Sequence, residues 1–426
     1  MDPRRLLLES FHAAVAAADP LRIVAAHLPE PPDPARGRTL VVGAGKAAAS
    51  MARAVELAWP GAAPLDGLVI TRYAHGLPTE RLRVVEAGHP VPDESGERAA
   101  AEILVAASAL GPEDLLLALV SGGGSSLLSL PVEAVPMSDL KAVTRALLAS
   151  GAPIQEMNVV RKHLSRIQGG RLAQSSRARA CALVVSDVAG DDVSAIASGP
   201  CAPDPSTYAD AIDVLARWGV TPPHSVAAHL ARGARGVIEE TPKPGDPLFA
   251  RVENRLIATA HGSLEAAARV FESNGVRAVI LGDTVTGEAR DVAQVMAAMV
   301  REIRGHGGPF APPVALVSGG ECTVTLRGAG RGGRCSEFLL ALTKALGGLS
   351  GVSAIAADTD GIDGVESNAG AVMTPDTAAR AAALGLDPRR SLDANDGFGF
   401  FEALGDLVIT GPTRTNVNDY RAILVA

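Results

Sequence analysis

Residues 41–50 read Val41-Val-Gly-Ala-Gly-Lys-Ala-Ala-Ala-Ser50, and this stretch decides the fold class. A predicted strand over 39–42 ends in a glycine turn, and the alanine run after it predicts a helix over 46–58. A strand, a glycine turn and a helix in this order begin a βαβ unit. Backbone N–H groups at such a turn, aided by the helix dipole, bind anionic oxygen atoms. We therefore predict an α/β fold with an anion site at this turn.

The alternation of strand and helix patterns continues along the whole chain. Short β-rich runs alternate with long alanine-rich runs, which is typical of βαβ units that build mainly parallel sheets. The segment Thr241-Pro-Lys-Pro-Gly-Asp-Pro-Leu248 holds three prolines, which cannot lie inside a helix or a central strand. We therefore predict two α/β/α (Rossmann-like) domains over residues 1–240 and 241–426, with mainly parallel sheets and an interdomain cleft.

The expected strands follow from the apolar runs. In the first domain they are 39–42, 68–71, 83–86, 115–120 and 182–186. In the second domain they are 255–259, 278–281, 314–318, 323–327, 353–357 and 406–409. The runs at 314–318 and 323–327 are expected to pair as a hairpin.

Composition excludes several classes of protein. Of the 426 residues, 47% are hydrophobic and 20% are charged, and no apolar run approaches the length of a membrane span. The four cysteines have no C-x-x-C spacing, so neither a zinc site nor a disulfide framework is indicated. A net charge of −8 with 3% aromatic residues argues against nucleic acid. We expect a cytoplasmic protein with no membrane and no nucleic-acid partner.

The first candidate anion site is the turn at 43–46. Gly43 and Gly45 allow the backbone to approach an anion, and Lys46 is placed to neutralise charge on a transferring phosphoryl group. The alternative for Lys46 is a solvated lysine on an exposed turn. With Ala48, the turn also fits the dinucleotide pattern G-x-G-x-x-A, so NADP stays open as a ligand.

The second candidate is the segment Ser121-Gly-Gly-Gly-Ser-Ser126, which follows the apolar run at 115–120. Three successive glycines at the carboxyl end of a buried strand leave several N–H groups available for phosphate oxygens. A tight turn alone explains one glycine but not three. The residues expected to contact a ligand here are Ser121, Gly122, Gly123, Gly124 and Ser125.

Carboxylates at strand ends form the third candidate. Asp187 emerges from a predicted strand end, where it is placed to hold Mg²⁺ or to accept a proton from a substrate hydroxyl. Asp192 is a second metal candidate, although Gly-Asp-Asp commonly caps a helix or turn. In the second domain the run Asp358-Thr-Asp-Gly-Ile-Asp363 alternates carboxylates, and Asp363 is the metal candidate from it.

Two basic groups stand out in this acidic chain. Arg161, in the segment Asn158-Val-Val-Arg-Lys162, lies on a predicted helix, where solvated charge is the alternative to ligand binding. The segment Gly330-Arg-Gly-Gly-Arg334 places Arg331 and Arg334 in a glycine-rich loop before a helical pattern. Arginine binds carboxylates and phosphates through two parallel hydrogen bonds, so we expect an oxyanion clamp from this loop.

Taken in order, these segments resemble the glycerate 2-kinase family, whose C-terminal half is called the MOFRL domain. The matching stretches in the first half are 43–46, Gly88-His-Pro-Val-Pro92, 121–125, 158–162, 186–188, 190–192 and Ala197-Ser-Gly-Pro200. In the second half they are Ser318-Gly-Gly-Glu321, 332–334, Thr359-Asp-Gly-Ile-Asp-Gly364, Phe401-Glu-Ala-Leu-Gly-Asp406 and Thr415-Asn-Val-Asn-Asp419.

The resemblance implies an ATP- and Mg²⁺-dependent kinase that phosphorylates D-glycerate at its 2-hydroxyl to give 2-phosphoglycerate. Lys46, Asp187 and Arg334 are then the expected catalytic residues, and Asp187, Asp192 and Asp363 are the expected metal ligands. The expected substrate or nucleotide contacts are Gly43, Gly45, the residues 121–125 named above, Asn158, Arg161, Glu321 and Arg331.

Two other readings stay open from the sequence. An NADP-dependent hydroxypyruvate reductase fits the dinucleotide pattern with Arg72 at the end of the next strand. A sensor of sugar-acid phosphates uses the same anion sites without chemistry. The expected partners are D-glycerate and ATP, and a homodimer is a candidate assembly.

Overall fold

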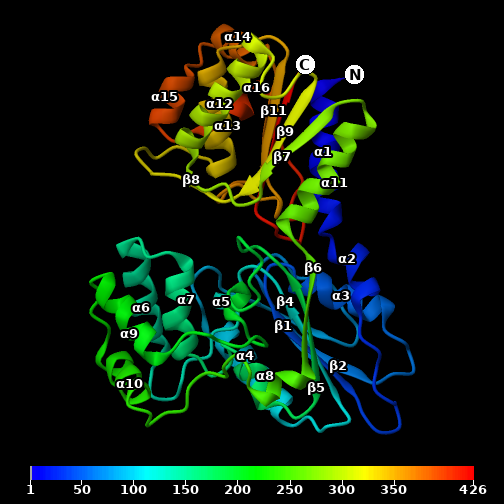
Figure 1. The fold of residues 1–426 in the computed structure, drawn as a ribbon, viewed down its shortest axis with the longest axis vertical. Coiled ribbons are helices and arrows are strands. Elements are labelled where there is room, and N and C mark those ends of the chain that lie inside the picture. The colour runs from blue at the N-terminus through cyan, green and yellow to red at the C-terminus, as the bar shows by residue number, and fades with distance from the viewer. Residues whose placement is uncertain (1) are drawn as a thin grey trace. The chain divides into compact units, whose positions relative to one another are not determined.

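The structure is a computed structural model that describes residues 2–426. It divides into two compact units. One runs from Pro20 to Ile257, and the other joins Ala258–Ala426 to the N-terminal segment that ends at Asp19. In each unit a six-stranded sheet lies among helices (Figure 1). The α/β class expected from the sequence is confirmed.

The sheet of the first unit has the strand order β3-β2-β1-β4-β5-β6. Its strands are β1 (Thr39–Ala44), β2 (Leu65–Arg72), β3 (Arg83–Ala87), β4 (Leu115–Val120), β5 (Arg179–Val185) and β6 (Val252–Ala258). The pairs from β3 through β5 are parallel, as predicted. The chain runs outward from β1 to β2 and β3 on one side, and then returns to β4 and β5 on the other. The strand order therefore reverses between β1 and β4, and ligands of open α/β sheets bind at such switch points.

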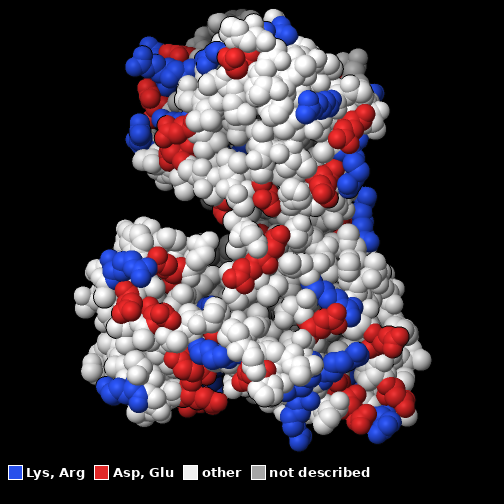
Figure 2. Space-filling view, viewed as in Figure 1, with Lys and Arg blue, Asp and Glu red and all other residues white. Residues whose placement is uncertain are grey.

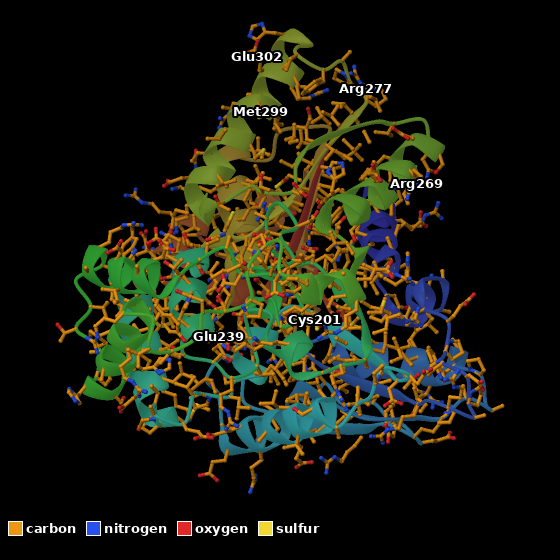
Figure 3. All side chains as sticks on the ribbon, turned by 60° about the horizontal axis from the view of Figure 1, so that its bottom comes forward. Cys201, Glu239, Arg269, Arg277, Met299 and Glu302 are labelled. Carbon is orange, nitrogen blue, oxygen red and sulfur yellow. The ribbon has the colours of Figure 1, made fainter. Side chains whose placement is uncertain are left out.

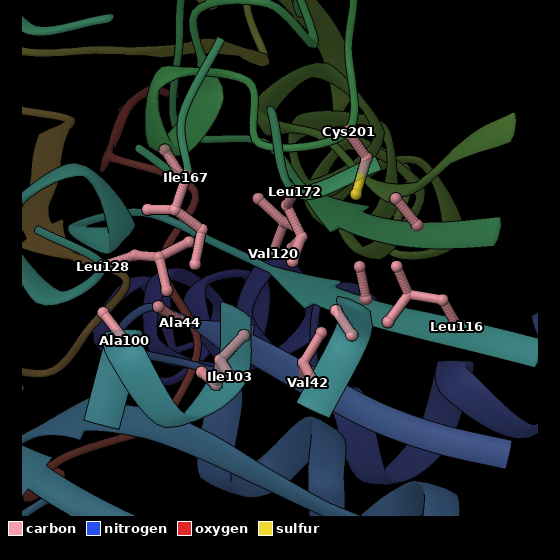
Figure 4. Packing of buried hydrophobic residues seen from close by; sticks show 14 of the residues in the cluster. Val42, Ala44, Ala100, Ile103, Leu116, Val120, Leu128, Ile167, Leu172 and Cys201 are labelled. Atoms are coloured by element: carbon pink, nitrogen blue, oxygen red, sulfur yellow. The ribbon is translucent and has the colours of Figure 1, made fainter. Parts of the chain in front are cut away.

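Apolar packing explains why these strands are buried. Val42 of β1, Leu116 of β4 and Ile103 of helix α4 (Glu94–Ser108) belong to one core cluster, shown in Figure 4. A separate cluster holds together the helices α6 (Met137–Ser150), α7 (Ile154–His163), α9 (Tyr208–Arg217) and α10 (His224–Ala234). These four helices form a group beside the sheet in Figure 1. The other helices of the unit are α2 (Pro20–Ile23), α3 (Ala48–Ala58), α5 (Gly124–Leu127) and α8 (Arg171–Ser175), with short 3-10 turns at Val24–His27, Ile196–Ser198 and Pro247–Arg251.

The sheet of the second unit has the order β13-β12-β11-β14-β9-β7. Its strands are β7 (Arg277–Gly282), β9 (Val314–Gly320), β11 (Val352–Asp358), β12 (Gly370–Met373), β13 (Leu407–Val408) and β14 (Asp419–Val425). Only β7 and β9 pair in parallel, whereas β14 is antiparallel to both β9 and β11. The prediction of a mainly parallel sheet is therefore wrong for this unit. A strand buried on both faces gives the same apolar run in either direction, so the pattern does not report its orientation.

Alternate residues of β9 lie in two different cores. Val314 and Leu316 pack in a cluster with α12 (Ala289–His306) and α13 (Arg334–Leu346), whereas Ala315 and Val317 pack with α11 (Ala260–Ser273) and α1 (Pro3–Ala17). Helices therefore cover both faces of this sheet, as Figure 1 shows. The remaining elements of the unit are α14 (Thr377–Ala383), α15 (Pro388–Asp393), α16 (Gly397–Leu404), β8 (Gly287–Glu288) and β10 (Cys322–Thr323).

Two local expectations differ from the structure. The predicted hairpin of 314–318 with 323–327 is wrong, because Cys322 and Thr323 pair with Gly287 and Glu288 instead of folding back on β9. The predicted domain boundary at 240 and the observed division after Ile257 also differ. The proline-rich segment lies within the first unit, and β6 beyond it completes the first sheet. Helix α1 packs in the core of the second unit, a long-range contact that its own sequence does not reveal.

All four cysteines are free and buried, among them Cys201, which is labelled in Figure 3. On the face drawn in Figure 2, Lys and Arg are intermixed with Asp and Glu. Among residues 2–426, no helix is long and apolar enough to cross a membrane.

Candidate active site

The turns that follow β1 and β4 touch each other at the switch point of the first sheet. The Lys46 N–H donates to the carbonyl of Gly122 over 2.8 Å, and the Ala47 N–H donates to Ser121 Oγ over 3.1 Å. Gly45 has φ +145°, and a β-carbon there would lie 2.0 Å from Ser121 Oγ. A side chain at residue 45 would therefore push the two turns apart, which explains this glycine.

The glycine turn after β4 offers donors to a ligand. Within the described residues, the N–H groups of Gly122 and Gly123 have no hydrogen-bond partner. Gly123 has φ +80°, and a β-carbon there would lie 2.9 Å from the ring of His89 and 3.5 Å from the side chain of Lys46. The turn thus presents two backbone donors next to a lysine and a histidine, an arrangement suited to anionic oxygens.

A chain of hydrogen bonds leads from this turn to helix α7. Ser125 Oγ lies 2.9 Å from Ser198 Oγ, which also donates to Asn158 Oδ1 over 3.2 Å. The same amide oxygen accepts from Arg161 Nη1 over 2.8 Å. Burial lowers the pKa of Arg161 to about 10. The structure thus brings together Ser125 from one predicted segment with Asn158 and Arg161 from another.

The two aspartates predicted after β5 lie in different settings. Asp187 is half-buried two residues beyond the end of β5, at the same sheet edge as the turns after β1 and β4. Asp192 is exposed, and its carboxylate accepts from the N–H of Ser194 over 2.8 Å and from Ser194 Oγ over 3.0 Å. Asp192 therefore caps a turn, the alternative that the Gly-Asp-Asp sequence left open.

In the second unit, Arg334 begins α13 and contacts three carboxylates. Its Nε donates to Asp419 over 2.7 Å, its Nη2 donates to Asp358 over 2.8 Å, and its Nη1 contacts Glu321. Burial lowers the pKa of Arg334, but these carboxylates outweigh burial and hold the pKa well above its ordinary value. Arg334 and Glu321, both predicted site residues, are therefore direct partners. An arginine bound in this way is not an open clamp for an anion.

Asp363 caps the start of α13. Its two carboxylate oxygens accept from the N–H groups of Cys335 and Ser336 over 2.9 and 2.8 Å, and its side chain is completely buried. Burial raises the pKa of Asp363, although these hydrogen bonds act in the opposite direction. A carboxylate at this place stabilises the start of the helix. The metal role predicted for Asp363 gains no support from this setting.

Arg331 lies on the surface. It pairs with Glu402 over 2.7 Å, and its guanidinium stacks 4.4 Å from the ring of Phe398. Both partners of the ion pair are about half-exposed. This is the ordinary solvated setting of an arginine, and the binding role of Arg331 stays a prediction.

Sequence reasoning missed several residues of these two clusters. His89 and Ser198 lie in the segments 88–92 and 197–200, which match the family pattern, but neither residue was predicted to belong to the site. Asp419 and Asp358 are the buried partners of Arg334, and no spacing rule connects them with it. Across residues 2–426, no group of three or more His, Cys, Asp and Glu is arranged to hold a metal ion.

Comparison with known proteins agrees with this architecture. A domain of unknown function, DUF4147, matches residues 6–231, and the MOFRL family matches residues 314–419. A protein of Agrobacterium vitis that bears the name hydroxypyruvate reductase is 52% identical over 425 residues, which cover 99% of this chain and 94% of its own. The glycerate 2-kinase of Pyrococcus horikoshii is 40% identical over 430 residues, covering 98% of this chain and 96% of its own.

A solved structure has the same fold. The crystal structure of a glycerate kinase from Thermotoga maritima matches with a TM-score of 0.87 and 37% identity, covering 99% of both chains. Fold, domain order and sequence thus agree over nearly the entire length. The chain therefore belongs to the glycerate 2-kinase family, which joins a DUF4147 domain to a MOFRL domain.

Proposed function

We propose that this protein transfers the γ-phosphoryl group of ATP to the 2-hydroxyl of D-glycerate, giving 2-phosphoglycerate and ADP. The observation that carries the proposal is the pair of unpartnered N–H groups of Gly122 and Gly123 beside Lys46, at the switch point of the first sheet. Family membership supports the same activity, because full-length relatives bear the names glycerate 2-kinase and glycerate kinase.

The residues of the turns would act chiefly by electrostatics. The N–H donors of Gly122 and Gly123 hold phosphate oxygens, and Lys46 neutralises charge that develops during transfer. Gly43 and Gly45 let β1 and its turn approach β4 closely, as the contact with Ser121 requires. Asp187 is the candidate to accept the proton of the substrate hydroxyl or to contact the metal.

Magnesium fits this site only in part. Asp187 is the predicted metal carboxylate that lies at the same sheet edge as the two turns, and Asp192 and Asp363 cap a turn and the start of a helix. Mg²⁺ is commonly bound through one or two carboxylates together with the phosphates of the substrate, so a dedicated protein cage is unnecessary. When bound, the ion would neutralise phosphate charge. We propose Asp187 as its protein contact.

The contacts of Arg334 indicate a positioning role for this residue. Its guanidinium is bonded to Glu321, Asp358 and Asp419. We therefore propose that Arg334 affects catalysis by holding these carboxylates in position. We also propose that the protein is cytoplasmic and binds D-glycerate and ATP, with no nucleic-acid or membrane partner, and a homodimer is its candidate assembly.

The test measures two reactions separately. Purified protein is mixed with ATP, Mg²⁺ and D-glycerate, and ADP release is followed by a coupled assay. Adding enolase identifies the product, because 2-phosphoglycerate and not 3-phosphoglycerate is its substrate. Absence of ADP release above background would contradict the proposal.

The second candidate is NADP-dependent reduction of hydroxypyruvate. The pattern Gly43, Gly45 and Ala48 and the name of the Agrobacterium vitis relative favour it. Oxidation of NADPH by hydroxypyruvate in the absence of ATP would support this reductase. A protein that releases ADP with D-glycerate and leaves NADPH unchanged excludes it.

A further inference from the structure

Arg161 is half-buried, and its partner differs from that of the buried lysine that follows it. Its Nη1 donates to the neutral amide oxygen of Asn158, and within the described chain it pairs with no carboxylate. The next residue, Lys162, is by contrast paired with the buried carboxylate of Asp204 over 2.7 Å. The positive charge of Arg161 is therefore half-buried with no carboxylate partner, a setting in which a bound anion would supply the missing charge.

The position of Arg161 connects it to the phosphate-binding turn. Asn158 Oδ1 accepts from both Arg161 and Ser198, and Ser198 Oγ contacts Ser125 Oγ in the glycine turn. Asn158 is itself fixed, because its Nδ2 donates to the carbonyl of Ala195 over 3.3 Å. A continuous set of hydrogen bonds thus fixes the guanidinium relative to the turn.

The backbone that carries Ser198 is strained. Ala197 and Ser198 have φ +50° and +59°, values that residues with a β-carbon rarely adopt. Left-handed backbone of this kind costs about 1–3 kcal/mol per residue and is found mainly at functional sites. This backbone conformation places the Ser198 hydroxyl, which is completely buried, between Ser125 and Asn158.

We propose that Arg161, positioned by Asn158 and Ser198, binds the carboxylate of a 2-hydroxy acid substrate beside the phosphate-binding turn. This inference rests on the proposed kinase function. It adds that the substrate carboxylate, held by Arg161, selects which hydroxyl reacts. In a 2-hydroxy acid the hydroxyl lies one carbon from the carboxylate. An anchored carboxylate close to the turn therefore brings the 2-hydroxyl, rather than a more distant one, to the phosphoryl donor.

The test compares Arg161→Gln with wild-type protein on D-glycerate and on its uncharged amide, glyceramide. Loss of a charge-assisted contact predicts about a 10- to 100-fold fall in kcat/KM for D-glycerate, with KM for ATP unchanged within about twofold. The rate with glyceramide should stay as in the wild type. Arg161→Lys keeps the charge but loses the planar fork, so its loss should be intermediate.

Arg166→Gln is the matched control. Arg166 is five residues away and its half-exposed side chain lies 3.7 Å from an exposed carboxylate, so this variant should act as the wild type. Circular dichroism melts of all variants verify folding. Equal losses for D-glycerate and glyceramide, a rise in KM for ATP alone, or the same loss in Arg166→Gln would overturn the proposal.

Ser198 provides a second test of the same site. Ser198→Gly removes the hydroxyl and the strain, whereas Ser198→Ala removes the hydroxyl alone. If the hydroxyl positions Arg161, both variants should raise KM for D-glycerate by about 3- to 10-fold with less change in kcat. Normal KM in both variants would remove Ser198 from the site.

Calorimetric titration separates this inference from the kinase proposal. A wild-type protein that releases no ADP would refute the kinase function, yet its binding of D-glycerate can still be measured. Binding that is lost in Arg161→Gln and kept in Arg166→Gln supports the carboxylate site. Absence of D-glycerate binding, or binding that Arg161→Gln leaves unchanged, refutes it.

Discussion

Replacing Arg334 by methionine should destabilise the second unit, because this cation neutralises two buried carboxylates there. The side chain of Asp419 is completely buried and that of Asp358 is 5% exposed, whereas Glu321 is 54% exposed. Removing one partner of a buried ion pair costs about 3–5 kcal/mol, and an exposed pair contributes about 0–1 kcal/mol. Asp419 keeps a second contact, to Arg421 Nη2 over 2.9 Å. We therefore expect the lower end of the range, about 3 kcal/mol.

Calorimetry measures this loss directly. For domains of about 150–250 residues, 1 kcal/mol corresponds to about 2–4 °C in Tm, so we expect the unit to melt about 6–12 °C lower. Arg331→Met is the control, because its pair with Glu402 lies on the surface and should change stability by less than about 0.5 kcal/mol. Adding Asp419→Asn to Arg334→Met should restore part of the loss, since it removes one uncompensated charge.

The outcome also bears on the catalytic role of Arg334. If Arg334→Met melts within about 2 °C of the wild type, the ion cluster does not stabilise the unit and the reasoning fails. A folded variant with no kinase activity would favour a part in catalysis. Activity that falls only as the variant unfolds would indicate that Arg334 maintains structure.

Three further predictions concern the first unit. Lys46→Ala should lower kcat by about 100- to 1000-fold with an unchanged melt, because its charge acts mainly in the transition state; a near-normal kcat in the coupled assay would exclude Lys46 from the mechanism. Asp187→Asn should lose activity that higher Mg²⁺ partly restores if the carboxylate contacts the metal, and unchanged activity would assign it a structural role only. Lys162→Met should cost about 3 kcal/mol at pH 7, because it leaves Asp204 buried without its cation. Burial raises the pKa of Asp204, but Lys162 and hydrogen bonds outweigh burial and hold it below its ordinary value. The stability from this pair is therefore present above about pH 4 and is lost as the pH falls through the lowered pKa. Denaturant melts should show the difference between wild type and Lys162→Met shrinking toward pH 3, and a constant difference would contradict this account.

The sequence predicted the parallel part of the fold well, because hydrophobic runs coincide with its strands. The runs at 115–120 and 182–186 fall on β4 and β5. The strand order was not predicted, because right-handed βαβ connections allow several orders. The last strand, β14, was missed. It contains Arg421, which interrupts the apolar run but is buried, with its guanidinium bonded to the carbonyls of Gly319 and Gly320. β14 lies between β9 and β11 and is antiparallel to both, and β12 is antiparallel to β11 as well, so the second sheet is mixed.

The candidate site was predictable where it depends on strand ends. Parallel strands that are neighbours in a sheet end at the same edge, so the turns at 43–46 and 121–125 had to lie close together once β1 and β4 paired. The ion pairs that neutralise a predicted site residue were not predictable in this way. Arg334 meets acidic residues from positions 321, 358 and 419, and only the tertiary fold brings these together.

Two arginines that the sequence assigned to the site therefore have different chemistry in the fold. Glycines beside Arg334 suggested an accessible clamp, yet three carboxylates neutralise it, so an incoming anion would have to compete with charges already in place. Arg161 lies on an ordinary helix face, yet its partner is an amide, and its charge stays available to an anion. In a protein of net charge −8, an incoming anion competes with the protein's own carboxylates for each cation. We therefore expect an anion to bind at a cation that has no acidic neighbour. If the proposal for Arg161 holds, the partner of an arginine, rather than the flexibility of its loop, decides which guanidinium binds the substrate carboxylate.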